Sequence, residues 1–320
     1  MSNFLPVTLI VPSNEESLKL KDLLRAVLFW TKFPSEIIIS DNSKKKFIID
    51  KKIKQIFKKK KILLRVLYKK NQYPGQARNL AIQKAAFSNL AFLDISTFCS
   101  NEWLQASYAL LNKNIDVVYG STRYLAYSYK SRLFRAATFG NRKLRTLPGS
   151  VIKKKIFKKI GLFSNTVRAG EDGLLFDKIN NLKLSFKNSP SIIEYTGNLN
   201  VSFLFFFRKW VRNYYSSSSL DFMMSQKIAY FFGTLILLIS IILFLMDYSD
   251  ILQLIILFYI FFRGLILPFT KCEKNYLFII LNFPFILIIS AWLDLAKTIG
   301  FATYYFMKLF NYFNNKISQD

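Results

Sequence analysis

Residues 88–97 read SNLAFLDIST and indicate the fold class of the N-terminal part of the chain. Their apolar run ends at a single carboxylate, Asp94, among hydroxyl-bearing residues, as a buried strand does at the edge of a sheet. Two earlier apolar runs, VTLIV and EIIIS, also have the pattern of buried strands, and they end at Pro12 and Asp41. Because ligands of open α/β sheets bind outside the carboxyl ends of the strands, we expect these ends to form one pocket.

The segments between these runs favour helices. Apolar residues recur at helical spacing after the SNEES loop and again from about Gln76, and the lysine-rich stretch 44–61 suits a solvated helix. A further helix is predicted to open at the adjacent acids Glu171 and Asp172, because carboxylates are favoured at helix N-termini. The alternation of strands and helices predicts an α/β domain with a parallel sheet covered by helices.

The composition changes near residue 225, where a basic region gives way to long apolar runs. Residues 228–246 carry no charge and are long enough to cross a bilayer core. A second span is predicted at 251–269 and a third, interrupted by Asn282 and Pro284, at 276–293. The predicted parts are a domain at 1–200, a basic aromatic interfacial segment at 201–227, and at 228–320 a membrane region with two or three transmembrane helices and a C-terminal amphipathic helix.

Charge and residue usage narrow the classes of function. The net charge of +27 suits a polyanionic partner, but no nucleic-acid-binding signature is present, so an anionic membrane surface is the better partner. The sequence has no histidine, which excludes Ser-His and Cys-His nucleophiles and leaves Asp or Glu as any general base. The DYSD loop between the first two spans lacks basic residues, so the positive-inside rule predicts a cytoplasmic N-terminal domain.

In their order along the chain, these segments resemble the family 2 glycosyltransferases with the GT-A fold, and in particular their membrane-anchored bacterial-type members. VTLIVPSNEE looks like the family's nucleotide loop, EIIISDNS like its base-contacting strand, YPGQARNLAI like its Gly-x-x-Arg-Asn helix start, LAFLDIST like its Asp-x-Asp strand and AGEDGLLF like its Glu-Asp pair. The resemblance implies inverting transfer of a sugar from a nucleotide-diphosphate sugar to a membrane-associated acceptor, a lipid or a lipid-linked glycan.

The resemblance also implies roles for the matching residues. Asp172 takes the position of the base that accepts the acceptor's proton, with Glu171 as the second candidate, and the adjacent like charge is expected to raise the proton affinity of one of the pair. Asp94 and Ser96 take the position of the ligands of a divalent cation, Mg²⁺ or Mn²⁺. The residues implied on the donor side are Pro12, Asn14, Glu15, Asp41, Gly75, Arg78, Asp94 and Ser96.

The chain departs from the family pattern at Ser96, where a second acid is expected. A hydroxyl is a poorer cation ligand than a carboxylate, so an alternative stays open: a catalytically impaired relative that serves as a membrane scaffold.

The segment FFFRKWVRNYYSSSS, residues 205–219, resembles the stretch with which membrane members of the family meet the bilayer. Arg208, Trp210 and Arg212 are expected to contact a diphosphate or a lipid phosphate. The simpler alternative is that basic residues flank membrane segments in any case.

Overall fold

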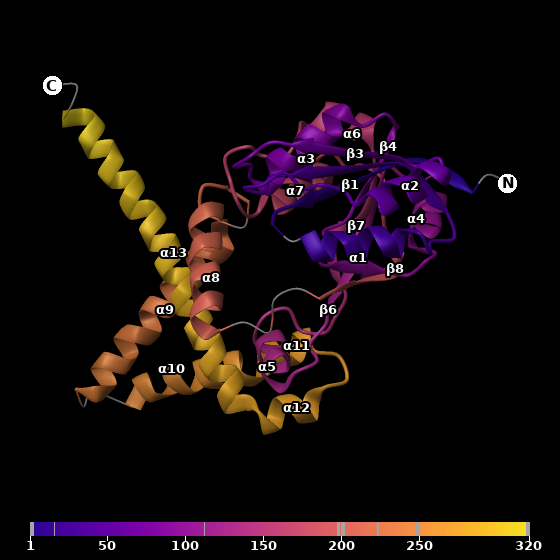
Figure 1. Cartoon of the computed structure of the whole chain (residues 1–320). Coiled ribbons are helices and arrows are strands. Elements are labelled where there is room, and N and C mark those ends of the chain that lie inside the picture. The colour runs from indigo at the N-terminus through magenta and orange to yellow at the C-terminus, as the bar shows by residue number, and fades with distance from the viewer. Residues whose placement is uncertain are drawn as a thin grey trace. The chain divides into compact units, whose positions relative to one another are not determined.

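The chain folds into two compact units in the computed structural model (Figure 1). The first is formed by residues 1–125 and 143–197, and the second by residues 126–142 and 198–320. The residues that the structure describes are 3–15, 17–111, 113–196, 199, 202–222, 224–246 and 250–317.

Eight strands form one sheet within the described part of the first unit. They are β1 (Phe4–Ser13), β2 (Phe33–Asp41), β3 (Leu63–Tyr68), β4 (Asn89–Phe92), β5 (Thr97–Cys99), β6 (Val117–Tyr124), β7 (Leu144–Lys153) and β8 (Phe186–Tyr195). Their order is β3-β2-β1-β4-β7-β6-β8-β5. The first four in this order are parallel, as predicted, whereas β7 pairs antiparallel with both β4 and β6.

Helices cover both faces of this sheet. They are α1 (Ser17–Val27), α2 (Lys51–Lys59), α3 (Pro74–Lys84), α4 (Trp103–Leu111), α6 (Lys154–Ile160) and α7 (Glu171–Asn181). Successive strand residues point to opposite faces, so Leu9 and Ile37 share a core with α1, α2 and α4, while Ile10 and Ile38 share one with α3, α6 and α7. The predicted α/β fold class is confirmed, with one apolar core on each face of the sheet.

The carboxyl ends of β1, β2 and β4 lie next to one another. Ser13 stands opposite Asp41 in the pairing of β1 with β2, and Ile10 stands opposite Phe92 in the pairing of β1 with β4. Asp94 follows two residues after Phe92. The three strand ends therefore open on the same edge of the sheet, which is where an α/β sheet binds its ligand.

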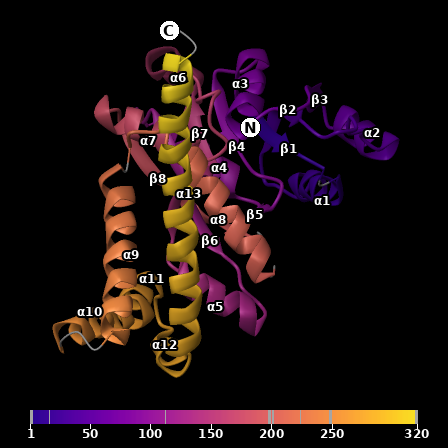
Figure 2. The same ribbon diagram turned by 90° about the vertical axis from the view of Figure 1, so that its left-hand side faces the viewer.

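The second unit is helical in its described residues. Its helices are α5 (Tyr129–Ala137), α8 (Phe203–Ser217), α9 (Met224–Leu245), α10 (Asp250–Phe261), the π-helical turn η1 (Phe262–Ile266), α11 (Leu267–Lys271), α12 (Tyr276–Leu281) and α13 (Phe283–Ile317). The long helix α13 runs alongside α8, as two views of the ribbon show (Figure 1, Figure 2).

Residues 126–142 belong to the second unit, although the sequence placed them within the N-terminal domain. The ring of Phe134 packs on Phe206 of α8, with centroids 4.6 Å apart. The Asn141 side chain donates to the Glu273 carbonyl (2.7 Å) and accepts from the Glu273 N–H (2.6 Å). Contacts between such distant segments leave no local pattern in the sequence. The assignment of residues 126–142 to the second unit therefore could not be predicted.

Three helical stretches of the described chain are long and apolar enough to cross a membrane, and they indicate a membrane protein: Met224–Leu245, Leu252–Lys271 and Phe283–Tyr312. The first two match the predicted spans. The third span differs from the predicted one, because the helix is interrupted at Asn282. The helix α13 begins after this residue, with Pro284 in its first turn. Proline fits a first helical turn, where its missing N–H costs no hydrogen bond.

Beyond Pro284, α13 continues as one helix to residue 317, so the expected amphipathic helix is its C-terminal part and not a separate element. Residues 247–249 of the DYSD loop, on which the predicted orientation depends, lie outside the described residues.

A buried charge cluster joins η1 to α13. Arg263 Nε and Nη2 lie 2.5 and 2.7 Å from the two carboxylate oxygens of Asp294, and Lys297 Nζ lies 3.1 Å from Asp294 Oδ1. The Tyr259 hydroxyl also donates to Asp294, at 3.1 Å. Arg263 is only 4% exposed. Arg263, which lies within the second apolar run of the sequence, is therefore buried inside the second unit, where a carboxylate on another helix pairs with it.

Gly300 allows α8 and α13 to approach closely. A Cβ at this position would lie 3.0 Å from Tyr214 Cβ and from Tyr215 N, and closer still to the Val211 carbonyl oxygen. Gly300→Ala is expected to destabilise the protein by about 1–3 kcal/mol, because the helices must separate.

Thermal unfolding of the detergent-solubilised chain checks this prediction. Gly233→Ala on α9 is the matched control, since nothing lies within 4 Å of its Cβ position. Alanine there is expected to be neutral or stabilising, because it favours the helix more than glycine does. Equal effects of the two substitutions would contradict the close packing at Gly300.

Candidate active site

Arg78 joins two carboxylates that come from different elements of the first unit. Its Nη2 lies 3.1 Å from Asp94 Oδ1, beyond the end of β4, and its Nη1 lies 2.8 Å from Glu171 Oε1, at the start of α7. The side chains of Arg78 and Glu171 are buried, whereas 30% of the Asp94 side chain is exposed. The guanidinium therefore fixes one carboxylate in the interior and another at the surface.

The negative charges of this cluster keep Arg78 cationic. Burial lowers the pKa of the Arg78 guanidinium, but Asp94, Glu171 and Asp172 outweigh burial and raise it overall. The pKa of the Glu171 carboxyl is raised by burial; Arg78 opposes this change and Asp172 adds to it. The expected effect of one acid on its neighbour is thus present at Glu171, where burial is the larger cause.

Asn79, the residue after Arg78, fixes the loop that leads to α7. Its amide Nδ2 donates to the Phe163 carbonyl and to Asn165 Oδ1, both at 2.9 Å, and its Oδ1 accepts from the Phe163 N–H at 2.9 Å. Asn79 received no role from the sequence. The available signal was its place in GQARN, because neighbouring helix positions let Arg78 hold the acids while Asn79 holds the loop.

Gly75, in the first turn of α3, lies against the same loop. A Cβ there would lie 2.6 Å from the Ser164 carbonyl oxygen, 3.1 Å from Phe163 Cβ and 3.4 Å from Glu171 Cγ. Gly75→Ala is expected to cost about 1–3 kcal/mol of stability and to shift Glu171 away from Arg78. Thermal unfolding and nucleotide titration of this variant, beside Gly233→Ala, check the prediction; wild-type values for both would contradict it.

Asp172 lies beside the cluster, but its carboxylate takes part in a local hydrogen bond. Its Oδ1 accepts from the Gly173 N–H at 2.8 Å, and the side chain is partly exposed. Gly170, with φ of +92°, turns the chain into α7 just before the two acids. Consecutive helix residues point about 100° apart, so Glu171 faces Arg78 while Asp172 points elsewhere. The two adjacent acids thus occupy different environments.

Tyr124 also lies near these carboxylates, and the sequence did not single it out. Burial raises the pKa of its phenol, and interactions with Tyr195, Asp94 and Asp172 act in the same direction. Tyr124 is the last residue of β6, and its place at the end of this strand brings the phenol to the site.

A cavity of about 670 Å³ opens beside the ends of β1 and β2. Its lining includes Ser13, Glu15, Lys21, Ser43 and the three lysines 44–46. The exposed Glu15 has φ of +56°; its N–H donates to the Ser43 hydroxyl (2.9 Å) and its Oε1 accepts from the Lys44 N–H (3.4 Å). Of the predicted donor residues, Pro12 lies near the end of β1 and Asn14 lies just after this strand. Carboxylate, hydroxyl and ammonium groups therefore share this cavity.

Asp41 is fully buried and shapes the loop around this cavity. Its Oδ1 accepts from the Ser43 N–H (3.1 Å) and from the Ser43 hydroxyl, and its Oδ2 accepts from the Phe47 N–H (2.6 Å). These internal bonds occupy both carboxylate oxygens. Asp41 thus sets the positions of the lining residues and leaves the exposed carboxylate there to Glu15.

Asp94 and Ser96 offer few ligands for a cation. Asp94 shares one oxygen with Arg78, and the buried Ser96 uses its carbonyl to accept from the Thr196 N–H (3.0 Å) and hydroxyl (3.1 Å). No three His, Cys, Asp or Glu side chains of the described residues are grouped to hold a metal ion. Since Mg²⁺ requires octahedral oxygen coordination, these residues fit it only when a bound diphosphate supplies further ligands.

Arg208, Trp210 and Arg212 all lie on α8, in the second unit, but on two faces of that helix. Arg208 and Arg212 line a groove between α8 and α13. Trp210 instead packs among aromatic rings and lies under Lys297, whose Nζ is 5.5 Å from its ring centroid. The three residues predicted as one group therefore divide into an exposed pair and a packed tryptophan.

Residues 8–170 match the sequence model of the family described as Glycosyl transferase family 2. No curated protein matches the chain significantly. Among solved structures, the chain is similar to GalNAc-T7 with UDP, GalNAc and Mn²⁺, at 16% identity and a TM-score of 0.48, covering 61% of this chain and 44% of that one.

Two microbial structures show comparable similarity. The mannosyltransferase PcManGT from Pyrobaculum calidifontis, in complex with GDP-Man and Mn²⁺, is 14% identical with a TM-score of 0.46, covering 65% of this chain and 63% of that one. Residues 1–349 of S. aureus TarS, in complex with UDP-GlcNAc, are 15% identical with a TM-score of 0.44, covering 93% and 91%. The chain thus spans less than two thirds of the first two proteins' lengths.

Proposed function

The chain belongs to glycosyl transferase family 2, and on this premise we propose that it transfers a sugar with inversion from a nucleotide-diphosphate sugar to a membrane-associated acceptor, a lipid or a lipid-linked glycan. The observation that carries the proposal is the ion-pair cluster around Arg78. It ties Asp94, on the edge where an α/β sheet binds ligands, to the helix start that bears Asp172. Donor-side and acceptor-side groups are thus linked by one buried cation.

In this proposal Asp172 is the general base. Its carboxylate takes the proton of the acceptor hydroxyl or phosphate as that oxygen forms a bond to the anomeric carbon. The bond from this carbon to the diphosphate breaks on the opposite face, so the configuration is inverted in a single displacement. Glu171 is occupied by Arg78 and buried, which favours Asp172 over Glu171 for this role.

The donor occupies the cavity beside β1 and β2 and extends toward Asp94. Glu15 accepts from the nucleoside hydroxyls, and Asp41 acts by holding the loop of residues 43–47. The lysines of that loop attract the negative diphosphate. Gly75 and Arg78 hold the Asp94 and Glu171 carboxylates in their positions relative to the donor.

Asp94, with Ser96 beside it, would hold a divalent cation together with the bound diphosphate. The cation would neutralise negative charge on the leaving diphosphate. Structures of two similar proteins contain Mn²⁺, which is compatible with this assignment. Arg78 contributes separately, because it fixes the orientation of the Asp94 carboxylate.

The membrane part supports an acceptor that resides in the bilayer, since three helices long and apolar enough to span follow the catalytic unit along the described chain. We propose that the catalytic unit faces the cytoplasm, because the DYSD loop between the first two spans contains no basic residue.

Calorimetric titration of the detergent-solubilised chain with UDP, GDP and dTDP, each with and without Mn²⁺, tests this function. Binding of one nucleotide, strengthened by Mn²⁺, is the expected result. The absence of binding to any of the three, with the protein shown to be folded, would favour the alternative of an impaired membrane scaffold.

A further inference from the structure

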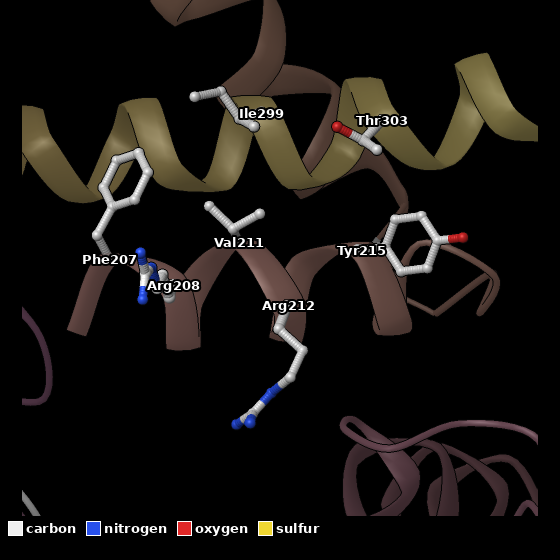
Figure 3. Close-up of a pocket in the computed structure, with 7 residues that line it drawn as sticks. All are labelled: Phe207, Arg208, Val211, Arg212, Tyr215, Ile299 and Thr303. Atoms are coloured by element: carbon white, nitrogen blue, oxygen red, sulfur yellow. The ribbon is translucent and has the colours of Figure 1, made fainter. Parts of the chain in front are cut away.

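A groove of about 400 Å³ runs between α8 and α13 in the second unit. Figure 3 shows Phe207 and Val211 of α8 facing Ile299 of α13, while Arg212 extends away from α13. Ile299 is 40% exposed. The groove thus has an apolar floor open to its surroundings, with a guanidinium at its edge.

The groove is held in shape at both ends. At one end the ring of Phe207 lies 4.5 Å from that of Trp292 on α13. At the other end Tyr215 contacts Tyr304 of α13 edge to face, with centroids 5.8 Å apart. The crossing at Gly300 sets the spacing of the helices between these contacts. Because the groove is preformed, binding of a ligand does not require the free energy of ordering the groove first.

The polar edge of the groove is cationic. Arg208 and Arg212 are one helical turn apart on α8 and both are exposed, and no acidic residue is among those that line the groove. Lys209 lies between them in sequence, and burial followed by the charge of Arg212 lowers the pKa of its ammonium. Like charges gathered on one surface favour an anionic partner.

The apolar floor and the cationic edge together favour one class of ligand, a phosphate that carries a hydrocarbon chain. Planar guanidinium groups match the oxygens of a phosphate, and an apolar floor matches a hydrocarbon chain. The adjoining residues Phe203, Leu204 and Phe205 are all exposed, as suits a helix at a membrane surface, and α13 is itself one of the candidate spans. A soluble nucleotide would gain little from this floor.

We propose that the groove between α8 and α13 binds a lipid phosphate, with its phosphate on Arg208 and Arg212 and its hydrocarbon chain along Phe207, Val211 and Ile299. This inference rests on the proposed function, in which such a lipid is the acceptor or carries it.

The test is calorimetric titration of the full chain in phosphatidylcholine nanodiscs with farnesyl phosphate, farnesol and inorganic phosphate. Farnesyl phosphate is expected to bind more tightly than either of the other two. The double variant Arg208→Gln/Arg212→Gln is expected to weaken its binding by about 10-fold or more, since charge-assisted hydrogen bonds are lost.

The double variant Lys58→Gln/Lys59→Gln is the matched control, because it removes the same charge from an exposed face of α2. It is expected to leave the affinity unchanged. Thr303→Trp fills the groove and is expected to weaken binding of farnesyl phosphate while both arginines are kept. Equal losses in the two double variants, or no loss in either, would overturn the proposal.

Farnesol binding as tightly as farnesyl phosphate would also overturn it, since the groove would then be an apolar surface for a chain or a protein helix. Nucleotide titration of the same samples separates this inference from the proposed function. If the wild-type chain binds no nucleotide, the proposed function is wrong whatever the lipid result. If nucleotide binds but the affinity for farnesyl phosphate is the same in Arg208→Gln/Arg212→Gln as in the wild type, only the assignment of the groove is wrong.

Discussion

Replacing Asp172 with asparagine is expected to lower the rate of sugar transfer by about 10²- to 10⁴-fold, the usual contribution of a general base. Asparagine keeps the size of the side chain and an oxygen that accepts from the Gly173 N–H. It cannot take a proton from the acceptor. The affinity for the nucleotide is expected to stay within about twofold of the wild type, because the donor cavity lies beside other strand ends.

Asp177→Asn is the matched control for this prediction. Asp177 lies on the same helix, and its Oδ2 accepts from the exposed Asn181 side chain at 3.2 Å. The substitution removes the same charge and is expected to leave the transfer rate near that of the wild type. Steady-state kinetics with both variants decide the matter: unchanged turnover in Asp172→Asn would exclude Asp172 as the base.

Arg78→Met is expected to destabilise the protein by about 3–5 kcal/mol, because it leaves the buried Glu171 carboxylate without its cation. Without the opposing charge of Arg78, burial and Asp172 raise the pKa of Glu171 further. A carboxyl whose pKa is higher in the folded state than in the unfolded state favours folding when protonated. The variant is therefore expected to lose stability as the pH rises from the ordinary range of a glutamate through the raised folded-state pKa.

Arg25→Met is the control, since Arg25 pairs at 3.4 Å with Asp22 and both side chains are more than half exposed. Surface pairs of this kind contribute at most about 1 kcal/mol. Denaturant unfolding followed by tryptophan fluorescence, at several pH values, measures both variants. A loss for Arg78→Met no larger than that for Arg25→Met would show that the buried cluster does not hold the site together.

The strands β1, β2 and β4 and the first two membrane helices could be predicted from the sequence because their patterns are local, whereas β5, β7 and β8 were not predicted. EIIIS and LAFLD carry their apolar residues in one run, and β2 and β4 form there. The side chains within those runs are less predictable. Glu36 opens EIIIS, yet it is fully buried, accepting from Thr8 (2.6 Å) and Arg65 (2.8 Å). Only the paired strands show why a carboxylate is tolerated there.

Part of the candidate site followed from motif order, and part required the fold. Arg78 and Glu171 were both selected, but their ion pair joins residues 93 positions apart, and no spacing rule gives that distance. Asp41 was selected for a nucleoside contact, whereas its oxygens are used by its own loop. Aspartate after a strand suits both uses equally, so the sequence could not separate them.

The anomeric configuration of the transferred sugar tests the central claim most directly. The purified chain, in nanodiscs that contain a lipid phosphate acceptor, is supplied with the nucleotide sugar whose diphosphate binds most tightly. Proton NMR of the first product then reports the configuration at the anomeric carbon. The proposed single displacement with Asp172 as base predicts a product of configuration opposite to that of the donor; a product with the donor's configuration, or no product from a folded protein that binds the donor, would contradict it.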